Sequence, residues 1–244
     1  MRKKSEKRLE QIAEGAVECF TELGLRRAQM ADIAKAASVS VGTLYLYVTS
    51  KEALLHLAIL RVCGRPLEDL TLPLPTPTMQ ETVSVAAARR AEIVKLPSLA
   101  TALGKGSQPD LPELEAIGGE FYDLMHEARR AVWLMNRLAL EVPEIDALQA
   151  EIMRGNFRDD LATVALKVAG KRGKPGPSVK LAARIALEAI AWTAMHRLRE
   201  SPANAIEGLS EDMARRAAAR SFASTLISAA TEDRTETRPL QLSS

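Results

Sequence analysis

The sequence is poor in aromatic residues and cysteine, and it has no long uninterrupted apolar run. Only 4% of its 244 residues are aromatic, although 47% are hydrophobic. Ala, Leu, Glu, Arg and Lys dominate instead, which favours an all-helical protein. Cys19 and Cys63 lie in apolar helical patterns without metal-site or disulfide spacing, so we expect a reducing, cytoplasmic location. Because a membrane span needs roughly 18 apolar residues, we expect neither a membrane protein nor a secretory leader.

The sequence also lacks a strong excess of positive or negative charge, and it lacks the common catalytic motifs. Thirty-three Lys and Arg oppose 31 Asp and Glu, a formal net charge of +2. That value is too small to indicate a nucleic-acid protein, so local patterns must decide. The chain has no Gly-rich phosphate loop, no paired His at metal spacing and no Gly-x-Ser-x-Gly motif, and Gly104–Ser107 is best interpreted as an ordinary turn. We therefore predict no enzyme, no metal and no cofactor.

The first 64 residues predict a compact helical unit. Apolar residues recur at helical spacing over 9–23, and Gly24 follows as a stop signal. Two short helical runs, 30–36 and 40–47, are separated by three residues and must turn sharply on each other. Ser50 is the expected cap of a fourth helix that runs towards Gly64. Helices this short are unstable alone, so packing on the first and fourth helices must hold them.

A proline-rich stretch follows and predicts a domain boundary, because proline removes backbone donors and blocks helix propagation. Its four prolines are Pro66, Pro73, Pro75 and Pro77. We expect a helix-turn-helix domain over 1–64, a larger helical-bundle domain over 65–231 and a polar, disordered tail over 232–244. In the larger domain we expect an exposed loop over 170–177 and helices near 78–96, 112–141, 144–170, 178–200 and 208–231.

The third helical run presents small, uncharged groups outward. With Leu44 facing the core, the outward residues are Val41, Gly42, Thr43, Leu46 and Tyr47, with Tyr45 partly exposed. This face carries no carboxylate, which suits close approach to a polyanion. Ser40 is the expected N-cap, and its helix's first amides would point towards a phosphate.

Much of this segment resembles the N-terminal helix-turn-helix of the tetracycline-repressor (TetR) family. The resemblance spans about residues 9–60 without gaps and is carried by Ile12, Ala16, Phe20, Gly24, Asp32, Ile33, Ala34, Ala37, Val39–Val48, Ser50, Lys51, Glu52, Leu54 and Leu55. Three positions depart from the family pattern. Gln29 replaces a capping Thr or Ser, Ser38 replaces a turn Gly, and Val48 replaces a common Phe. None removes a residue that DNA binding needs, although Gln29 is a weaker cap.

The resemblance implies a homodimer whose third helices enter the major groove of double-stranded operator DNA. It places Val41 and Thr43 at base-reading positions and Tyr45, Tyr47 and Lys51 at phosphate contacts. The whole expected DNA-binding set is Ser40, Val41, Gly42, Thr43, Tyr45, Leu46, Tyr47 and Lys51. Because Val41 and Thr43 form no bidentate pair with a base, direct readout should be modest. An N-terminal basic stretch could add salt-dependent contacts; its members are Arg2, Lys3, Lys4, Lys7 and Arg8.

The resemblance also implies that the larger half binds a small effector and pairs two copies through its last two helices. The expected dimer interface is Leu181, Ile185, Ala189, Trp192, Ala217, Ser221 and Ser224, although the same spacing fits an intrachain core. The expected effector-binding residues, where scarce large side chains concentrate, are Phe121, Tyr122, Met125, His126, Trp133, Met153 and Phe157. Such a lining favours an apolar or amphipathic ligand, with His126, His196 and Asn136 as candidate polar anchors.

The sequence thus predicts a ligand-responsive, sequence-specific transcriptional regulator. The expected form is a homodimeric repressor that a small apolar or amphipathic effector releases from a palindromic operator. Two alternatives stay open. One is a helical interaction protein on a TetR-like scaffold without specific DNA readout. The other is a helical enzyme that uses His126 or His196 with neighbouring carboxylates, although no residue spacing supports it.

Overall fold

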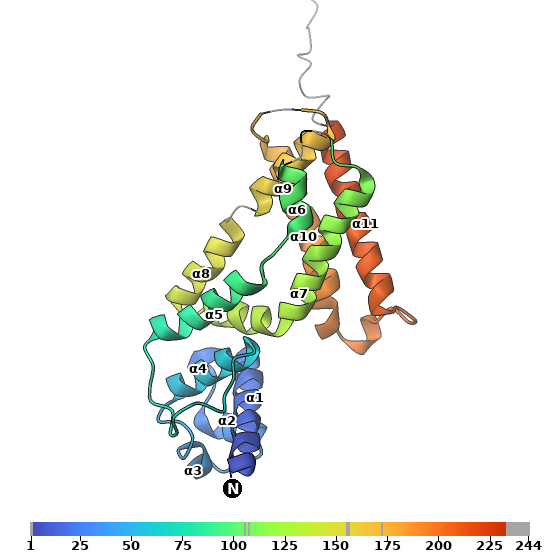
Figure 1. Ribbon diagram of the computed structural model, residues 1–244. Coiled ribbons are helices and arrows are strands. Elements are labelled where there is room, and N and C mark those ends of the chain that lie inside the picture. Colours follow the sequence, from blue (N-terminus) through green and yellow to red (C-terminus); the bar gives the residue numbers. More distant parts are fainter. Residues whose placement is uncertain (1, 105, 107, 155–156, 172, 233–244) are drawn as a thin grey trace, which may run out of the picture. The chain divides into compact units, whose positions relative to one another are not determined.

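The computed structural model describes residues 2–104, 106, 108–154, 157–171 and 173–232, and the predicted all-helical fold is confirmed (Figure 1). The N-terminal helices are α1 (Arg2–Arg27), α2 (Met30–Ala36), α3 (Val41–Leu44), α4 (Lys51–Val62) and α5 (Met79–Ile93). They are followed by α6 (Pro97–Gly104), α7 (Leu111–Ala139), α8 (Pro143–Arg154), α9 (Phe157–Val168), α10 (Pro177–Ala194) and α11 (Glu211–Glu232), with the short 3₁₀ helices η1 (His196–Arg199) and η2 (Pro202–Asn204) before α11. The described residues form no strand.

The chain divides into two compact units. The first holds the residues up to Val94 together with Arg130–Ile152. The second holds Lys95–Arg129 and the chain from Met153 onward, so α7 contributes to both. This division differs from the boundary expected after residue 64, because the proline-rich stretch and α5 lie in the first unit. Proline interrupts a helix, but it does not decide on which core the chain continues to pack.

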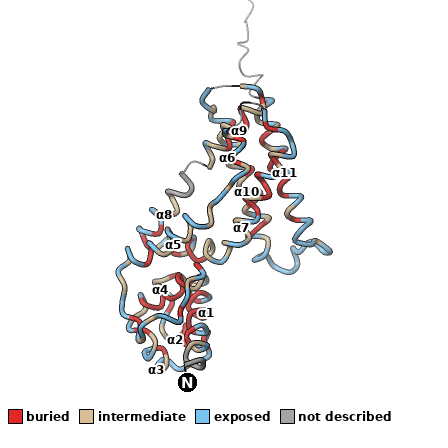
Figure 2. The backbone as a smooth tube through the Cα atoms, viewed as in Figure 1, coloured by how far each residue is buried: buried red, intermediate tan, exposed pale blue. Residues whose placement is uncertain are grey.

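The core of the first unit forms between α1 and α4. Ile12, Ala16 and Phe20 recur at helical spacing on α1 and are fully buried. On the fourth helix Leu54 and Leu55 are also fully buried, and Figure 2 shows α4 buried along much of its length. Ile33 and Ala34 of α2 and Leu44 of α3 belong to the same buried cluster, so the short helices pack on this core, and apolar burial contributes about 25 cal/mol per Å².

The end of α1 is kinked at Gly24. Gly24 has φ 79°, a backbone conformation that residues with a Cβ atom rarely adopt. The helix then resumes as far as Arg27. The expected stop at Gly24 is therefore a kink followed by one more turn. The Glu141 carboxylate accepts a hydrogen bond from the Arg26 amide at 2.7 Å, and Arg137 donates to the Leu23 carbonyl at 2.6 Å. Arg137 near the end of α7, and Glu141 just after it, thus satisfy backbone groups that the kink leaves open.

The two short helices pack as expected, but α3 is shorter than predicted. Ile33, Ala34 and Leu44 are buried. Regular α-helix ends at Leu44 instead of residue 47, and hydrogen-bonded turns follow. The turn before it contains Ser38 with φ 53°, at the position where the family pattern has glycine. The Ser38 backbone therefore occupies a conformation that costs an L-residue about 1 kcal/mol or more.

The second unit contains α6, the first half of α7, and α9 to α11. Its core includes aromatic rings that pack on one another: the centroids of Phe121 and Phe157 lie 5.4 Å apart with perpendicular rings, and those of Phe121 and Phe222 lie 6.1 Å apart. Edge-on and tilted contacts of this kind suit the aromatic quadrupole. The sequence did not predict α6, and it predicted one helix over 144–170 where the structure has α8 and α9.

Candidate nucleic-acid interface

The N-terminus of α3 is fixed by hydroxyl groups. Ser40 is its N-cap, and the Ser40 hydroxyl oxygen accepts a hydrogen bond from the Thr43 amide at 3.1 Å. The two hydroxyl oxygens of Ser40 and Thr43 also lie 2.8 Å apart. The Thr43 amide also donates to the Ser40 carbonyl at 3.0 Å, so the backbone and the side chain of Ser40 both hold the first turn of α3. The Thr43 hydroxyl, on the face that is expected to read a base, is thereby in contact with the Ser40 hydroxyl.

The outer face of α3 is apolar and aromatic, without charge. Val41, Tyr45 and Leu46 are 38%, 51% and 69% exposed, while Leu44 is fully buried beneath them. Gly42 is exposed too. Tyr47 was predicted to point outward, but it is half-buried and packs against the core of the first unit. The face thus offers large side chains that can approach a groove closely without placing a carboxylate beside phosphates.

Lys51 begins α4 directly after this face. It is half-buried, and its Nζ donates to the Ala28 carbonyl at 3.2 Å. Since an ammonium group has three donors, two remain for a phosphate oxygen. The adjacent Ser50 caps α4 by accepting from the Ala53 amide at 3.1 Å. These contacts hold Lys51 near the turn that links α3 to α4, which is where a phosphate contact was expected.

The basic stretch at the N-terminus is only partly described. The backbone of α1 begins at Arg2, so this stretch is helical, but the side chains of Arg2, Lys3 and Lys4 lie outside the described residues. Lys7 is exposed and Arg8 is half-buried. The exposed position of Lys7 leaves its charge accessible to a polyanion.

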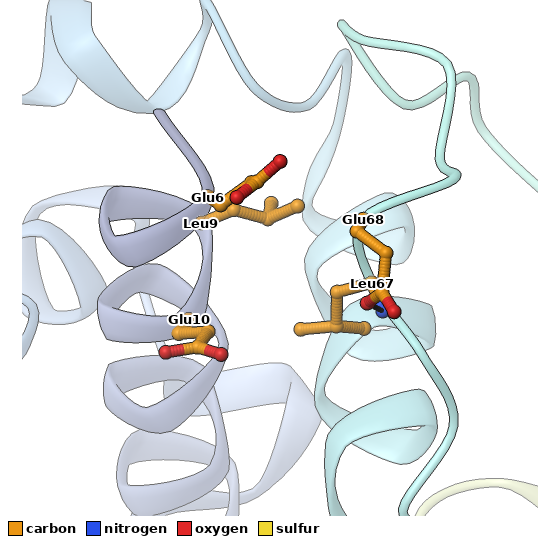
Figure 3. Close-up of a pocket in the computed structure, with 5 residues that line it drawn as sticks. All are labelled: Glu6, Leu9, Glu10, Leu67 and Glu68. Carbon is orange, nitrogen blue, oxygen red and sulfur yellow. Dashed lines mark hydrogen bonds between the residues drawn. The ribbon is translucent and has the colours of Figure 1, made fainter. Parts of the chain in front are cut away.

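An acidic pocket lies on the same unit, between α1 and the chain that follows α4. Its volume is about 300 Å³, and it is lined by Glu6, Leu9, Glu10, Leu67 and Glu68. Figure 3 shows Leu9 and Leu67 extending towards each other, with the three carboxylates around them. Carboxylates repel phosphate, so this pocket does not extend the candidate interface. Among the described residues, no cluster of His, Cys, Asp and Glu could hold a metal ion.

Two comparisons with known proteins concern this same segment. Residues 12–58 match the family described as bacterial regulatory proteins, tetR family, and this range runs from Ile12 in α1 through α2 and α3 to Ala58 in α4. The N-terminal segment of this chain is thus similar to the helix-turn-helix segment of that family. Its similarity extends to the uncharacterized HTH-type transcriptional regulator YvdT of Bacillus subtilis (strain 168), which is 42% identical over 55 residues. That match covers 22% of this chain and 28% of YvdT, so it concerns the N-terminal segment alone.

The expected effector-binding residues are divided between the two units. Phe121, Tyr122, Met125, His126 and Phe157 lie in the second unit, whereas Trp133 lies in the first. The Met153 side chain lies outside the described residues. Phe121 and Tyr122 are almost completely buried, and the Tyr122 and His126 rings stack with centroids 6.1 Å apart. The second unit therefore gathers three of the four aromatic members of the set, all but Trp133, as packed side chains.

A polar cluster that the sequence did not reveal borders these rings. Tyr122 donates its hydroxyl hydrogen to Glu211, the first residue of α11. The same carboxylate lies 3.1 Å from the Nδ1 atom of His126 and 2.5 Å from Arg197 in η1. Burial raises the pKa of Glu211, but the hydrogen bonds from Tyr122 and Arg197 outweigh it and lower the pKa below its ordinary value. Arg197 and Glu211 were missed because no local spacing links them to α7.

The expected dimer-interface residues lie on an exposed face of α10 and α11. Leu181, Ile185 and Trp192 are 61%, 52% and 44% exposed at helical spacing along α10, and Ala189 between them is half-buried. On α11, the small residues Ala217, Ser221 and Ser224 are exposed. The apolar spacing on α10 therefore belongs to a surface and not to the core of this chain. None of the helices in the described part of the chain combines the length and apolar composition required to cross a membrane.

Proposed function

We propose that this protein is a sequence-specific, DNA-binding transcriptional regulator that acts as a homodimer. The observation that carries the proposal is the outer face of α3, which exposes Val41, Tyr45 and Leu46 while Leu44 anchors it to the core. In the TetR family this helix enters the major groove. Val41 and Thr43 would contact base edges, and Tyr45, Tyr47 and Lys51 would contact phosphates.

The exposed apolar face of α10 supports the homodimer. A second copy of Leu181, Ile185 and Trp192 would bury these side chains, and the small residues on α11 would allow close helix approach. A two-fold pairing is self-complementary, because each residue meets the same patch on its partner. It would also present two recognition helices to the two halves of a palindrome.

We further propose that a small apolar or amphipathic effector controls DNA binding through the second unit, with repression as the resting state. The clustered rings of Phe121, Tyr122, His126 and Phe157 support an apolar site there. The effector must prefer the conformation that releases DNA, since a ligand that binds both conformations equally shifts nothing. A catalytic role is not part of this proposal.

Selection from a random double-stranded DNA library at about 150 mM salt, near physiological ionic strength, tests the proposal. We expect enrichment of a palindrome whose half-sites lie about one helical turn apart. Thr43→Ala should alter the preference at one base position, whereas Thr71→Ala, an exposed threonine outside the interface, should not. Salt-sensitive binding without any enriched sequence would favour the interaction protein that lacks specific DNA readout.

A further inference from the structure

The proline-rich segment 65–78, here called the strap, packs back onto the helix-turn-helix. The chain leaves α4 through Gly64, whose φ of 65° allows the reversal. Leu67 and Leu74 are then buried in the core of the first unit, 6% and 8% exposed. The teal trace between α4 and α5 in Figure 1 shows the strap running back towards α3 before it reaches α5. The strap therefore belongs to the unit that carries the recognition helix.

The strap pairs with the residues that join α3 to α4. The Leu74 amide donates to the Tyr47 carbonyl at 2.7 Å, and the Thr49 amide donates to the Leu74 carbonyl at 3.0 Å. These two bonds form an isolated parallel bridge around Val48, whose side chain is fully buried. They satisfy backbone groups that no helix serves, because regular α3 has ended at Leu44.

Side-chain hydroxyl groups extend this pairing to the cap of α4. The Thr49 hydroxyl donates to the Leu74 carbonyl at 3.1 Å and lies 3.2 Å from the Thr76 hydroxyl. The Thr76 hydroxyl donates to Ser50 Oγ at 2.8 Å, and Ser50 also accepts from the Ala53 amide. The strap thus contacts both residues of the Thr49–Ser50 joint, through Leu74 and Thr76.

The joint separates two of the proposed phosphate contacts. Tyr47 precedes it and Lys51 follows it, so a change in the backbone of Thr49 and Ser50 would move the two side chains relative to each other. Pro75 and Pro77 flank Thr76 and restrict the strap's own backbone. A contact held in its bound geometry loses less entropy on binding than a mobile one.

We propose that Thr49 and Thr76 are positioning residues for DNA binding, which hold the α3–α4 joint so that Tyr47 and Lys51 reach the phosphates together. The inference rests on the proposed function. Neither threonine needs to touch DNA, since each acts through the joint. The strap therefore contributes to DNA binding in addition to connecting α4 to α5.

The test uses Thr76→Val in the full chain, with DNA that the wild type has selected from a random library. Valine keeps the branched shape of threonine and removes the hydroxyl group. We expect about a tenfold loss of affinity, with a midpoint of thermal unfolding close to that of the wild type. Thr76→Ser should restore most of the affinity because it keeps the hydroxyl group. Thr71→Val, an exposed position in the same strap, should bind as the wild type does.

A salt titration and a double-mutant cycle separate positioning from a general loss of stability. If Thr76 acts through Lys51, Thr76→Val should reduce the dependence of log affinity on log salt, as Lys51→Gln does, by about one for each lost phosphate contact. The loss in the double variant should then be smaller than the sum of the two single losses. Wild-type affinity and salt slope in Thr76→Val, or strictly additive losses, would overturn the role of the strap while leaving the proposed function intact. Failure of the wild type to select any sequence would overturn both.

Discussion

Each unit of this protein carries a group of exposed large side chains, and the two groups are arranged differently. In the first unit Val41, Tyr45 and Leu46 lie on the short α3 and the turn that follows it, and they form a narrow uncharged face. In the second unit such side chains follow a long helix, where Leu181, Ile185 and Trp192 form an apolar line. A narrow face without charge suits a groove lined by phosphates, whereas a long apolar line suits another helix. The location of exposed apolar groups thus distinguishes the two binding surfaces that we propose for this chain.

The largest expected effect tests the surface of the second unit. Replacing both Leu181 and Ile185 by Glu places charges where the proposed partner copy would pack, so we expect the dimer to dissociate. Light scattering should then report the monomer mass, and affinity for a selected palindrome should fall by more than about tenfold. Ile206→Glu, which changes an exposed residue outside this line, should leave the dimer intact. A dimer that survives the double change would refute the assignment of this surface.

A tight helix contact in the first unit should give the next effect. A Cβ atom on Gly15 would lie 2.7 Å from the Ala37 backbone nitrogen, so Gly15→Ala must push α1 and the end of α2 apart. We expect a loss of about 1–3 kcal/mol in the free energy of unfolding, measured with urea, although alanine favours helix.

Gly42 is the matched control, because a Cβ there would meet only Ser40 Oγ, at 3.9 Å. Gly42→Ala should preserve stability and weaken DNA binding, since the added methyl lies on the α3 face. Equal stability losses in both variants would show that the two glycines do not differ as the structure indicates.

The turn before α3 offers a smaller, stabilising change. Ser38 has φ 53°, and glycine adopts this conformation without the steric cost of a Cβ. Ser38→Gly should raise the free energy of unfolding by up to about 1 kcal/mol, seen as a higher thermal midpoint. DNA affinity should stay unchanged because Ser38 lies outside the proposed contacts. A lower midpoint would mean that the Ser38 side chain stabilises the turn by more than its backbone conformation costs.

The smallest effect concerns an ion-pair network in the first unit. Burial raises the pKa of Glu14, but Arg130 and Arg61 outweigh burial through hydrogen bonds and charge, so the pKa lies below its ordinary value of 4.5. A lowered pKa stabilises the fold above the unfolded-state value, and this contribution is lost as pH falls through the folded-state pKa.

Glu14→Gln should therefore reduce stability at pH 7 by less than about 1 kcal/mol, because the groups are partly exposed, and the difference from the wild type should shrink below about pH 4.5. Urea unfolding at several pH values measures it. Asp69→Asn, an exposed carboxylate of the same unit, serves as the control. A difference that grows with acidity would contradict the sign of the pKa shift.

Local sequence signals predicted the helix-turn-helix in detail. The bounds of α2, the caps Ser40 and Ser50, and the burial of Leu44 all follow from patterns within a few residues. Capping and helical spacing are local properties, so a sequence alone reveals them. The half-buried position of Tyr47 was not foreseen, because it depends on α3 ending early.

Features that depend on distant segments were missed. The prolines of the strap predicted a break, yet its pairing with Tyr47 and Thr49 joins residues about 25 positions apart, as the Thr49–Leu74 separation shows. The same holds for Arg197 and Glu211, which meet Tyr122 from other helices. The division of the expected effector-binding set followed from α7, whose two halves serve different units. Helical spacing cannot reveal such a division.

The most direct test of the central claim compares binding to a full palindrome with binding to one half-site. The claim is that the first unit reads DNA through α3 while the second unit pairs two copies. We predict that two chains bind one selected palindrome, and that a single half-site binds at least about a hundredfold more weakly, because it engages only one recognition helix. Equal affinity for both DNA molecules, or one chain per palindrome, would contradict the account.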